Sequence, residues 1–413
     1  MMYYIEFLIL TFSLVAAKNN VCPSHLDYFT ITFNSKCWYD PDVDATIPEI
    51  INNYGFKSES YNVTTLDGYI IEIFRIPSKL NEISNKTKTP LILFHGMARD
   101  ARSWLILGED SPAIYYAKKG YDVWLANRRG TEYSSHIKYS RNDKEFWNFS
   151  FHEMGTMDVP TIIEKVADVS KQPGNIIYIG HSMGTTASFV YCSLNITHCA
   201  KNLKTIISLA PVANFNHMKI PMCHTMSYFT NELEFILTHV GLLKMETNFF
   251  RICQTAPFTS ICAALMQFFI GTSTPNIYPR IMPILSAHGN TALCLKVALH
   301  YGQIIKSKGQ FRQYDYGQIE NLKKYNSTVP PKYNLKGIPV NVTLIYANND
   351  LVAYKPDVEE IYSNLHPNRR VIVEIPRNGT AKYLAHPDFF TAANIKNVLY
   401  PEIDNVLNKI KNE

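Results

Sequence analysis

A single decapeptide restricts what this chain can fold into more than any other stretch. Residues 175–184 read Asn-Ile-Ile-Tyr-Ile-Gly-His-Ser-Met-Gly, and small, helix-compatible residues follow at 185–190. Glycines on both sides of Ser182 let a tight turn close without a Cβ clash. Such a strand-to-helix turn lifts a serine hydroxyl towards a base, and the helix start offers backbone N–H groups to an anion. The pattern therefore predicts a strand, a sharp turn and a helix, with Ser182 as a nucleophile.

Short apolar runs alternate with helical patterns along most of the chain. The runs are rich in β-branched and aromatic residues, as in strands that are covered on both faces. A hairpin comes before them, within residues 60–76, with its turn at Leu66-Asp67-Gly68. The predicted buried strands are residues 91–94, 121–126, 175–179, 203–209, 340–346 and 371–375. This alternation predicts an α/β fold, with a mostly parallel central sheet flanked by helices.

Start signals accompany two of the expected helices. Asp158 is expected to cap a helix that Pro160 opens. Its apolar face would contain Ile162, Ile163, Val166 and Val169. A closing amphipathic helix is expected after Pro401, because apolar residues recur at spacings of three and four between 403 and 410.

The alternation of strands and helices stops between residues 215 and 336. Apolar helical patterns at 229–243 and 261–270 are mixed there with turn-rich stretches, and strand character returns only near Val340. The simplest interpretation is a mainly helical cap inserted over the carboxyl edge of the sheet. The core would then comprise residues 18–214 and 337–413. A separate second domain is less favoured because no Gly/Ser or Pro linker marks either boundary.

The N-terminus indicates a chain that enters the secretory route. An apolar stretch from Phe7 to Val15 is followed by small residues that suit cleavage after Ala17, so residues 1–17 are expected to be a signal peptide. The stretch departs from the usual pattern, since Glu6 precedes it and no Lys or Arg does. It is too short for a membrane span, and no other run of about 18 apolar residues occurs, so no transmembrane segment is expected. The net charge of +5 is too small and dispersed to favour a nucleic-acid partner.

Seven Asn-x-Ser/Thr sequences are consistent with secretion. Asn148 is expected to be too enclosed by its aromatic neighbours to accept a glycan. The remaining glycosylation candidates are Asn62, Asn85, Asn195, Asn326, Asn341 and Asn378.

The eight cysteines favour disulfides over a metal site. They include no repeated Cys-x-x-Cys pair and no paired histidines at zinc spacing, so no metal is expected. Cys253 with Cys262, and Cys22 with Cys37, could each close a small loop. Spacing does not decide the other pairings.

A serine on such a turn needs an acid and a histidine from later loops of the sheet, in that order. Asp350 follows the strand at 340–346, and His386 lies on a loop before the last helix. A carboxylate there would orient the imidazole, and His386 would take the Ser182 proton as general base and return it as general acid.

Other residues compete for the roles of Asp350 and His386. Asp357 lies in a predicted helix, and Asp388 is too near His386 in sequence to come from a separate loop, so Asp350 is favoured. Three histidines are expected to serve surface or packing roles, namely His288, His300 and His366. His181, beside the nucleophile, is expected to be structural.

An oxyanion hole requires two backbone N–H donors. One is expected from Met183. The other is expected from Met97, in the loop after the strand at 91–94, although His95-Gly96 alone is also compatible with an ordinary turn.

Several longer segments resemble the acid lipase family, which includes gastric and lysosomal acid lipases and secreted insect relatives. The similarity runs from about Pro48 to the last helix. The segments that carry it are Tyr54-Gly55-Phe56, Asp67-Gly68-Tyr69, His95-Gly96-Met97, residues 121–130, residues 145–147 with 150–154, residues 180–184, His300-Tyr301-Gly302-Gln303, Asn349-Asp350 and residues 386–389.

The resemblance implies an α/β hydrolase core with a cap and lid. It places a catalytic triad on Ser182, Asp350 and His386 and a cap disulfide on Cys253 and Cys262. It also implies hydrolysis of neutral lipid esters, usually triacylglycerols, at a lipid–water interface without a cofactor. The sequence departs from the family at Met97, Met183, Pro387, residues 287–290 and a longer loop at 377–385, which leaves acyl preference and pH optimum open.

Two further interpretations stay open beside a secreted lipase. One is a carboxylesterase, sterol esterase or acyltransferase of the same fold. The other is a lipid carrier without catalysis, which is less favoured because all three triad residues are present. The destination could be extracellular fluid or the lysosome, and the sequence does not predict an oligomeric state.

Overall fold

A computed structural model describes residues 19–77, 88–246, 253, 258, 261–262, 277–287, 291–377 and 383–412. The proposed signal peptide, Asn85, His288, Asn378 and most of the helix expected at 261–270 lie outside these residues. Within them, no helix is both long and apolar enough to cross a bilayer.

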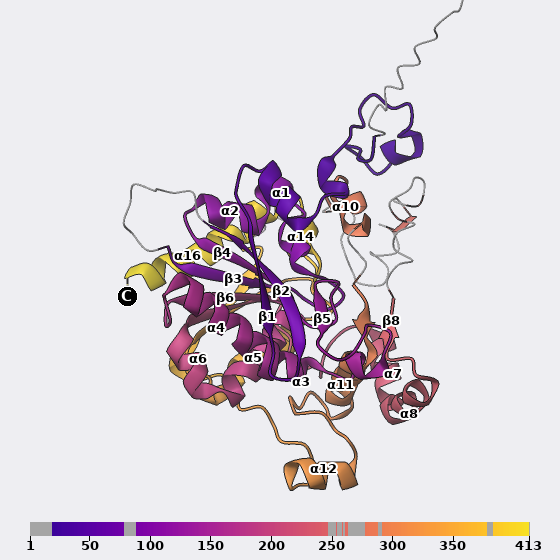
Figure 1. Cartoon of the computed structure of the whole chain (residues 1–413), viewed down its shortest axis with the longest axis vertical. Helices are drawn as coiled ribbons and strands as arrows, with labels where there is room; N and C mark the ends of the chain where they lie inside the picture. The colour runs from indigo at the N-terminus through magenta and orange to yellow at the C-terminus, as the bar shows by residue number, and fades with distance from the viewer. Residues whose placement is uncertain are drawn as a thin grey trace, which may run out of the picture.

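One large sheet forms the centre of the molecule (Figure 1). Its strands run in the order β1-β2-β4-β3-β6-β7-β10-β11, and β5 also pairs with β2. Pairing is antiparallel among β1, β2, β4 and β5 and parallel from β4 to β11. The strands are β1 (Glu59–Thr64), β2 (Tyr69–Ile76), β3 (Pro90–Phe94), β4 (Asp122–Ala126), β5 (Ser134–His136), β6 (Ile176–His181), β7 (Leu203–Leu209), β10 (Asn341–Ala347) and β11 (Arg370–Ile375). The predicted hairpin and mostly parallel sheet are confirmed.

Helices cover both faces of the sheet. α2 (Pro112–Lys118) and α16 (Tyr400–Asn412) lie together on one face, and α4 (Val159–Ser170), α5 (Met183–Leu194) and α6 (Ile196–Asn202) cover the other (Figure 1). The hydroxyl of Tyr115 on α2 donates to Asp404 on α16 at 2.8 Å. Every residue of β3, β4 and β6 is buried, as their uninterrupted apolar sequences predict.

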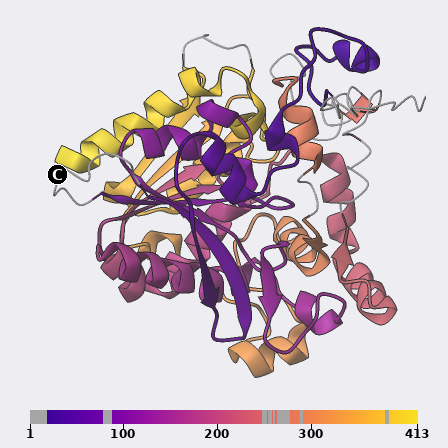
Figure 2. The same cartoon turned by 45° about the horizontal axis from the view of Figure 1, so that its top comes forward.

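The described parts of the segment between β7 and β10 lie beside this core (Figure 2). Here α11 packs against both α7 and α8, and the short strands β8 and β9 pair antiparallel. Its elements are α7 (Pro221–Tyr228), α8 (Thr230–Val240), β8 (Lys244–Met245), α10 (Ile281–Ala287), β9 (Leu293–Cys294), α11 (Leu295–Lys306) and α12 (Gln318–Tyr325). The remaining α-helices in the described residues are α1 (Ile47–Asn53), α3 (Phe151–Glu153), α13 (Lys355–Asn364), α14 (Asp388–Thr391) and α15 (Ile395–Val398).

The cysteines form three disulfides. Cys22 is bonded to Cys37 and Cys253 to Cys262, the two small loops anticipated from sequence, and Cys192 is bonded to Cys199. Cys223 and Cys294 are not bonded to another cysteine. The Cys192–Cys199 bond joins the end of α5 to α6, a pairing that the sequence left open.

The expectation that Asn148 is enclosed is wrong. Its aromatic neighbours Phe146, Trp147 and Phe149 are buried, but Asn148 itself is exposed. Among the other candidates in the described residues, Asn62, Asn326 and Asn341 are exposed and Asn195 is half-buried. Its solvent exposure therefore gives no reason to exclude Asn148 from the glycosylation candidates.

The predicted capping role of Asp158 is also wrong. A π-helical turn, Met154–Asp158, leads directly into α4, so Asp158 has helical dihedral angles of −68° and −53° and makes no side-chain cap. Its fully buried carboxylate instead accepts from Nε of Arg129 at 2.8 Å and from the Arg129 backbone N–H at 3.1 Å. Burial raises the pKa of Asp158, and the Arg129 charge opposes that shift. Asp158 therefore compensates a buried cation.

Replacing Asp158 with alanine is expected to lower the free energy of unfolding by about 3 kcal/mol, because Arg129 would lose its fully buried counterion. Arg129 keeps Asp67, at 2.6 Å, which moderates the loss. Denaturant unfolding would measure the change. The matched control is Asp168→Ala on the same helix, whose ion pair with Lys171 is exposed and whose loss should leave the unfolding midpoint unchanged. Equal midpoint shifts in the two variants would contradict this account.

Candidate active site

Ser182 occupies the tight turn between β6 and α5. Its dihedral angles are 52° and −121°, a left-handed conformation that side chains rarely adopt. A Cβ at Gly180 would lie 2.8 Å from the Gly184 carbonyl oxygen, and one at Gly184 would lie 2.5 Å from the Phe94 oxygen. Both glycines are therefore needed for β6, α5 and the end of β3 to approach closely.

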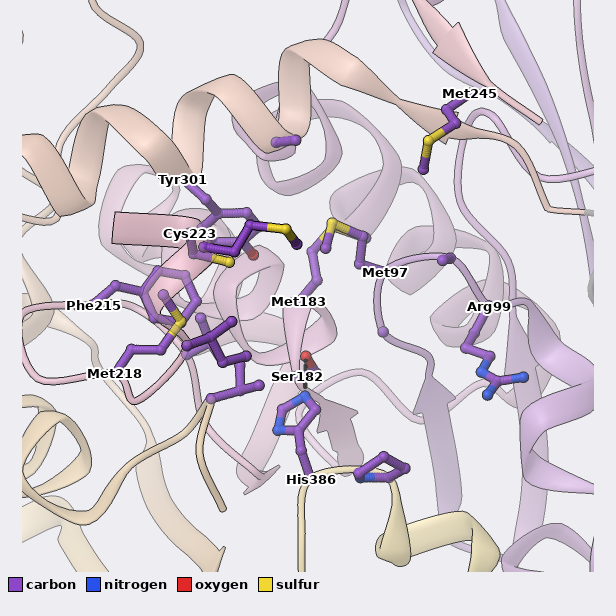
Figure 3. A pocket seen from close by; sticks show the side chains of 18 of the residues that line it. Met97, Arg99, Ser182, Met183, Phe215, Met218, Cys223, Met245, Tyr301 and His386 are labelled. Carbon is purple, nitrogen blue, oxygen red and sulfur yellow. Dashed lines mark hydrogen bonds between the residues drawn. The ribbon is translucent and has the colours of Figure 1, made fainter. Parts of the chain in front are cut away.

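The structure brings the three predicted site residues into contact. His386 Nε2 lies 2.8 Å from Ser182 Oγ (Figure 3), and His386 Nδ1 lies 2.8 Å from Asp350 Oδ2. The Asp350 side chain is fully buried and that of His386 is 11 % exposed. Asp350 Oδ1 accepts from the backbone N–H groups of Val352 and Ala353, each at 2.8 Å. Both carboxylate oxygens are thus engaged, and the imidazole bridges the hydroxyl and the carboxylate.

Two hydrogen bonds that sequence reasoning did not predict connect the loops of Asp350 and His386. Asn348 Oδ1 accepts from the Leu384 backbone N–H at 3.0 Å, and the Leu384 carbonyl accepts from the Asn349 N–H at 3.0 Å. Asp388, considered as a rival acid, accepts from the Ala385 N–H at 2.8 Å and so shapes the loop beside His386. An asparagine at a strand end was the only signal for the first of these links.

Asp357 lies elsewhere. It is on α13, as predicted, and its Oδ1 accepts from the His217 backbone N–H at 2.8 Å and lies 3.1 Å from His217 Nδ1. The structure therefore pairs it with His217 and not with His386.

The other histidines have packing or local contacts. His300 is buried with its ring 3.8 Å from that of Phe151, and burial lowers the pKa of His300 to about 3. His366 precedes the short helix Pro367–Arg369 and its side chain accepts from the Asn368 N–H. His181 Nε2 lies 3.2 Å from the His386 carbonyl oxygen. Burial, followed by the charge of His386, lowers the pKa of His181 well below its usual value, so His181 is neutral beside the site.

The loop after β3 lies against the Ser182 turn. A Cβ at Gly96 would be 3.1 Å from the Ser182 Cβ, so Met97 follows at the same edge of the site. Met183 is the first residue of α5, where backbone N–H groups have no partner within the helix. Met97 and Met183 both line the cavity that contains Ser182 (Figure 3). Their positions allow the two N–H donors expected of an oxyanion hole.

The cavity has a volume of about 780 Å³ and reaches from Ser182 and His386 into the segment between β7 and β10. Apolar side chains of α7, α8, α11 and the chain before α7 line most of it, among them Phe215, Met218, Met226 and Leu237. A volume of this size accommodates a long acyl chain or a drug-sized ligand.

The sheet topology, the turn at Ser182 and the Ser-His-Asp contacts define the class of protein as an α/β hydrolase. Residues 89–236 match the profile of the α/β hydrolase fold, and residues 47–108 match that of a partial α/β-hydrolase lipase region. A hypothetical protein of Pseudomonas aeruginosa shares the fold, with a TM-score of 0.53 at 10% identity over 91% of this chain and 99% of that one.

Similar proteins identify the family of this chain within the α/β hydrolases. Lipase 1 of Drosophila melanogaster is 30% identical over 89% of this chain and 81% of its own length. Gastric triacylglycerol lipase of Bos taurus is 30% identical over 94% and 97%, and that of Homo sapiens 30% over 90% and 93%. The chain therefore belongs to the family of gastric-type acid lipases, and it is a carboxylic ester hydrolase. The resemblance drawn from the sequence is confirmed.

Proposed function

We propose that this protein is a secreted lipase that hydrolyses triacylglycerols through an acyl-enzyme on Ser182. The contact of His386 with both Ser182 Oγ and Asp350 carries the proposal. Relatives named gastric triacylglycerol lipase support the choice of substrate.

The proposed reaction follows from these contacts. Ser182 Oγ attacks the ester carbonyl while its proton passes to His386 Nε2, and Asp350 stabilises the resulting imidazolium. The N–H groups of Met97 and Met183 hold the tetrahedral oxyanion. When the C–O bond breaks, His386 returns the proton to the leaving alcohol. Water then attacks the acyl-enzyme and gives its proton to His386, which passes that proton to Ser182 Oγ as the acyl C–O bond breaks and the fatty acid leaves.

Residues 215–336 act, in this proposal, as a cap that docks on lipid. Their described helices α7 and α8 expose several large apolar side chains to solvent: Met222, Met226, Tyr228, Phe235, Ile236 and Val240. Such a patch marks a surface for lipid or protein contact.

The three disulfides are consistent with export through an oxidising compartment. The proposal also includes cleavage after Ala17 and glycosylation at the accessible asparagines. The destination is extracellular in this proposal, with the lysosome as the alternative.

Activity on emulsified trioctanoylglycerol tests the function, and a cap variant tests the docking surface. Replacing both Phe235 and Ile236 with serine is expected to lower the rate on emulsion about tenfold, because two exposed apolar side chains would no longer enter the lipid. The rate on a dissolved short-chain ester should stay the same. Leu66→Ser, at the exposed β1–β2 turn, is the matched control.

The same comparison separates the alternatives. Equal rates on emulsion for the cap variant and wild type would contradict the proposed docking surface. A wild type that hydrolyses only dissolved esters would indicate an esterase. A protein that binds trioctanoylglycerol and hydrolyses no ester would indicate a carrier, and transfer of the acyl group to an added alcohol faster than to water would indicate an acyltransferase.

A further inference from the structure

The cavity at Ser182 is almost devoid of charge. No aspartate, glutamate or lysine occurs among its described lining residues, and Arg99 is the one side chain there with a permanent charge. The two lining histidines are His181, which burial keeps neutral, and His386. A lone cation in an apolar cavity attracts an anion, because few other groups compensate it.

Arg99 has no counterion within the described part of the chain. No hydrogen bond or ion pair of its guanidinium is found there, whereas its neighbour Asp100 is engaged by Arg102 at 2.7 Å. Arg102 also pairs with Glu132, so the nearby carboxylates belong to that arginine. Arg99 is half-buried. Burial lowers the pKa of Arg99, and Asp100 offsets this only in part, as expected for a cation without a close carboxylate.

Arg99 lies in the same cavity as the reacting groups. It follows Met97 by two residues on the loop after β3 and appears with Met97 among the lining side chains (Figure 3). Its charge contributes to lowering the pKa of His181, whose ring centroid is 5.1 Å from that of His386. Arg99 therefore borders the same cavity as Ser182, from the loop that also carries Met97.

We propose that Arg99 is a binding site for an anionic oxygen group, phosphate or carboxylate, carried by a lipid that occupies the cavity at Ser182. A guanidinium donates two parallel N–H bonds to either group. The phosphate would come from an anionic lipid ester, and the carboxylate from the fatty-acid product. The inference rests on the proposed function for the placement of the lipid. It adds that the same site binds lipids with a negatively charged group.

Binding measurements test Arg99 independently of catalysis. Isothermal titration of octyl phosphate and of octanoate into wild type, Arg99→Gln and Arg99→Lys is expected to show about tenfold weaker binding of at least one ligand to the glutamine variant, partly restored by lysine. Arg369→Gln, which removes an exposed arginine outside the cavity, is the matched control and should bind as wild type does. Equal affinities of wild type and Arg99→Gln for both ligands would overturn the proposal.

Kinetics identify the source of the anion. For 1-octanoylglycerol 3-phosphate against 1-octanoylglycerol, Arg99→Gln is expected to lower the ratio of kcat/KM values about tenfold if the lipid phosphate is the ligand. If the product carboxylate is the ligand, that ratio stays constant and inhibition by octanoate weakens about tenfold instead. A wild type that binds octyl phosphate through Arg99 but hydrolyses neither ester would contradict the proposed function and leave the anion site standing.

Discussion

Replacing Ser182 with alanine is expected to lower kcat on a dissolved ester by about 10⁵-fold to 10⁶-fold, while the fold stays intact. The alanine removes the oxygen that His386 contacts at 2.8 Å, so no acyl-enzyme can form. Release of fatty acid measures the rate. Mass spectrometry after treatment with a serine-reactive phosphonate should show one covalent adduct in wild type and none in Ser182→Ala.

Ser188→Ala is the matched control for this experiment. Ser188 is buried on the same helix, α5, and its hydroxyl donates to the Thr185 carbonyl oxygen at 2.8 Å, away from His386. We expect this variant to keep its phosphonate labelling and most of its activity. A Ser182→Ala protein that is still labelled, or that still turns over ester at a rate near that of wild type, would show that a different group is the nucleophile.

Local sequence patterns were sufficient to predict the hairpin, the parallel strands and the order of the site residues, but not the short strands β5, β8 and β9. The runs that became β3, β4 and β6 are apolar throughout because both of their faces are covered, and that burial is visible in composition alone. Asp350 and His386 could be selected because each follows a late strand, and parallel strands bring their carboxyl ends to one edge of the sheet.

The errors and omissions arose where a distant partner decides the outcome. Asp158 carries a helix-start signal, but the buried Arg129, 29 residues earlier, determines where its carboxylate points. The Asn348 contact with the Leu384 N–H spans 36 residues, and no local pattern specifies it.

Replacing Asp350 with asparagine is expected to lower kcat by about 10⁴-fold with little change in KM. The amide oxygen can still accept from the Val352 and Ala353 N–H groups, so the loop should keep its shape. The amide nitrogen, however, would donate to His386 Nδ1 and leave the ring proton on Nε2, where it faces Ser182 and cannot accept the serine proton. Steady-state kinetics on a dissolved ester measure the loss, and thermal unfolding verifies the fold.

Asp357→Asn separates the role of Asp350 from that of its rival acid. Asp357 is also buried, but its partner is His217, so this variant should lose stability while its folded fraction keeps a kcat within a few fold of that of wild type. The exchange has the same size and removes the same charge as Asp350→Asn. If kcat fell equally in the two variants, or fell less than about tenfold in Asp350→Asn, the orienting carboxylate would have to be sought elsewhere. Only a loss confined to Asp350 fits an imidazole held between that carboxylate and Ser182.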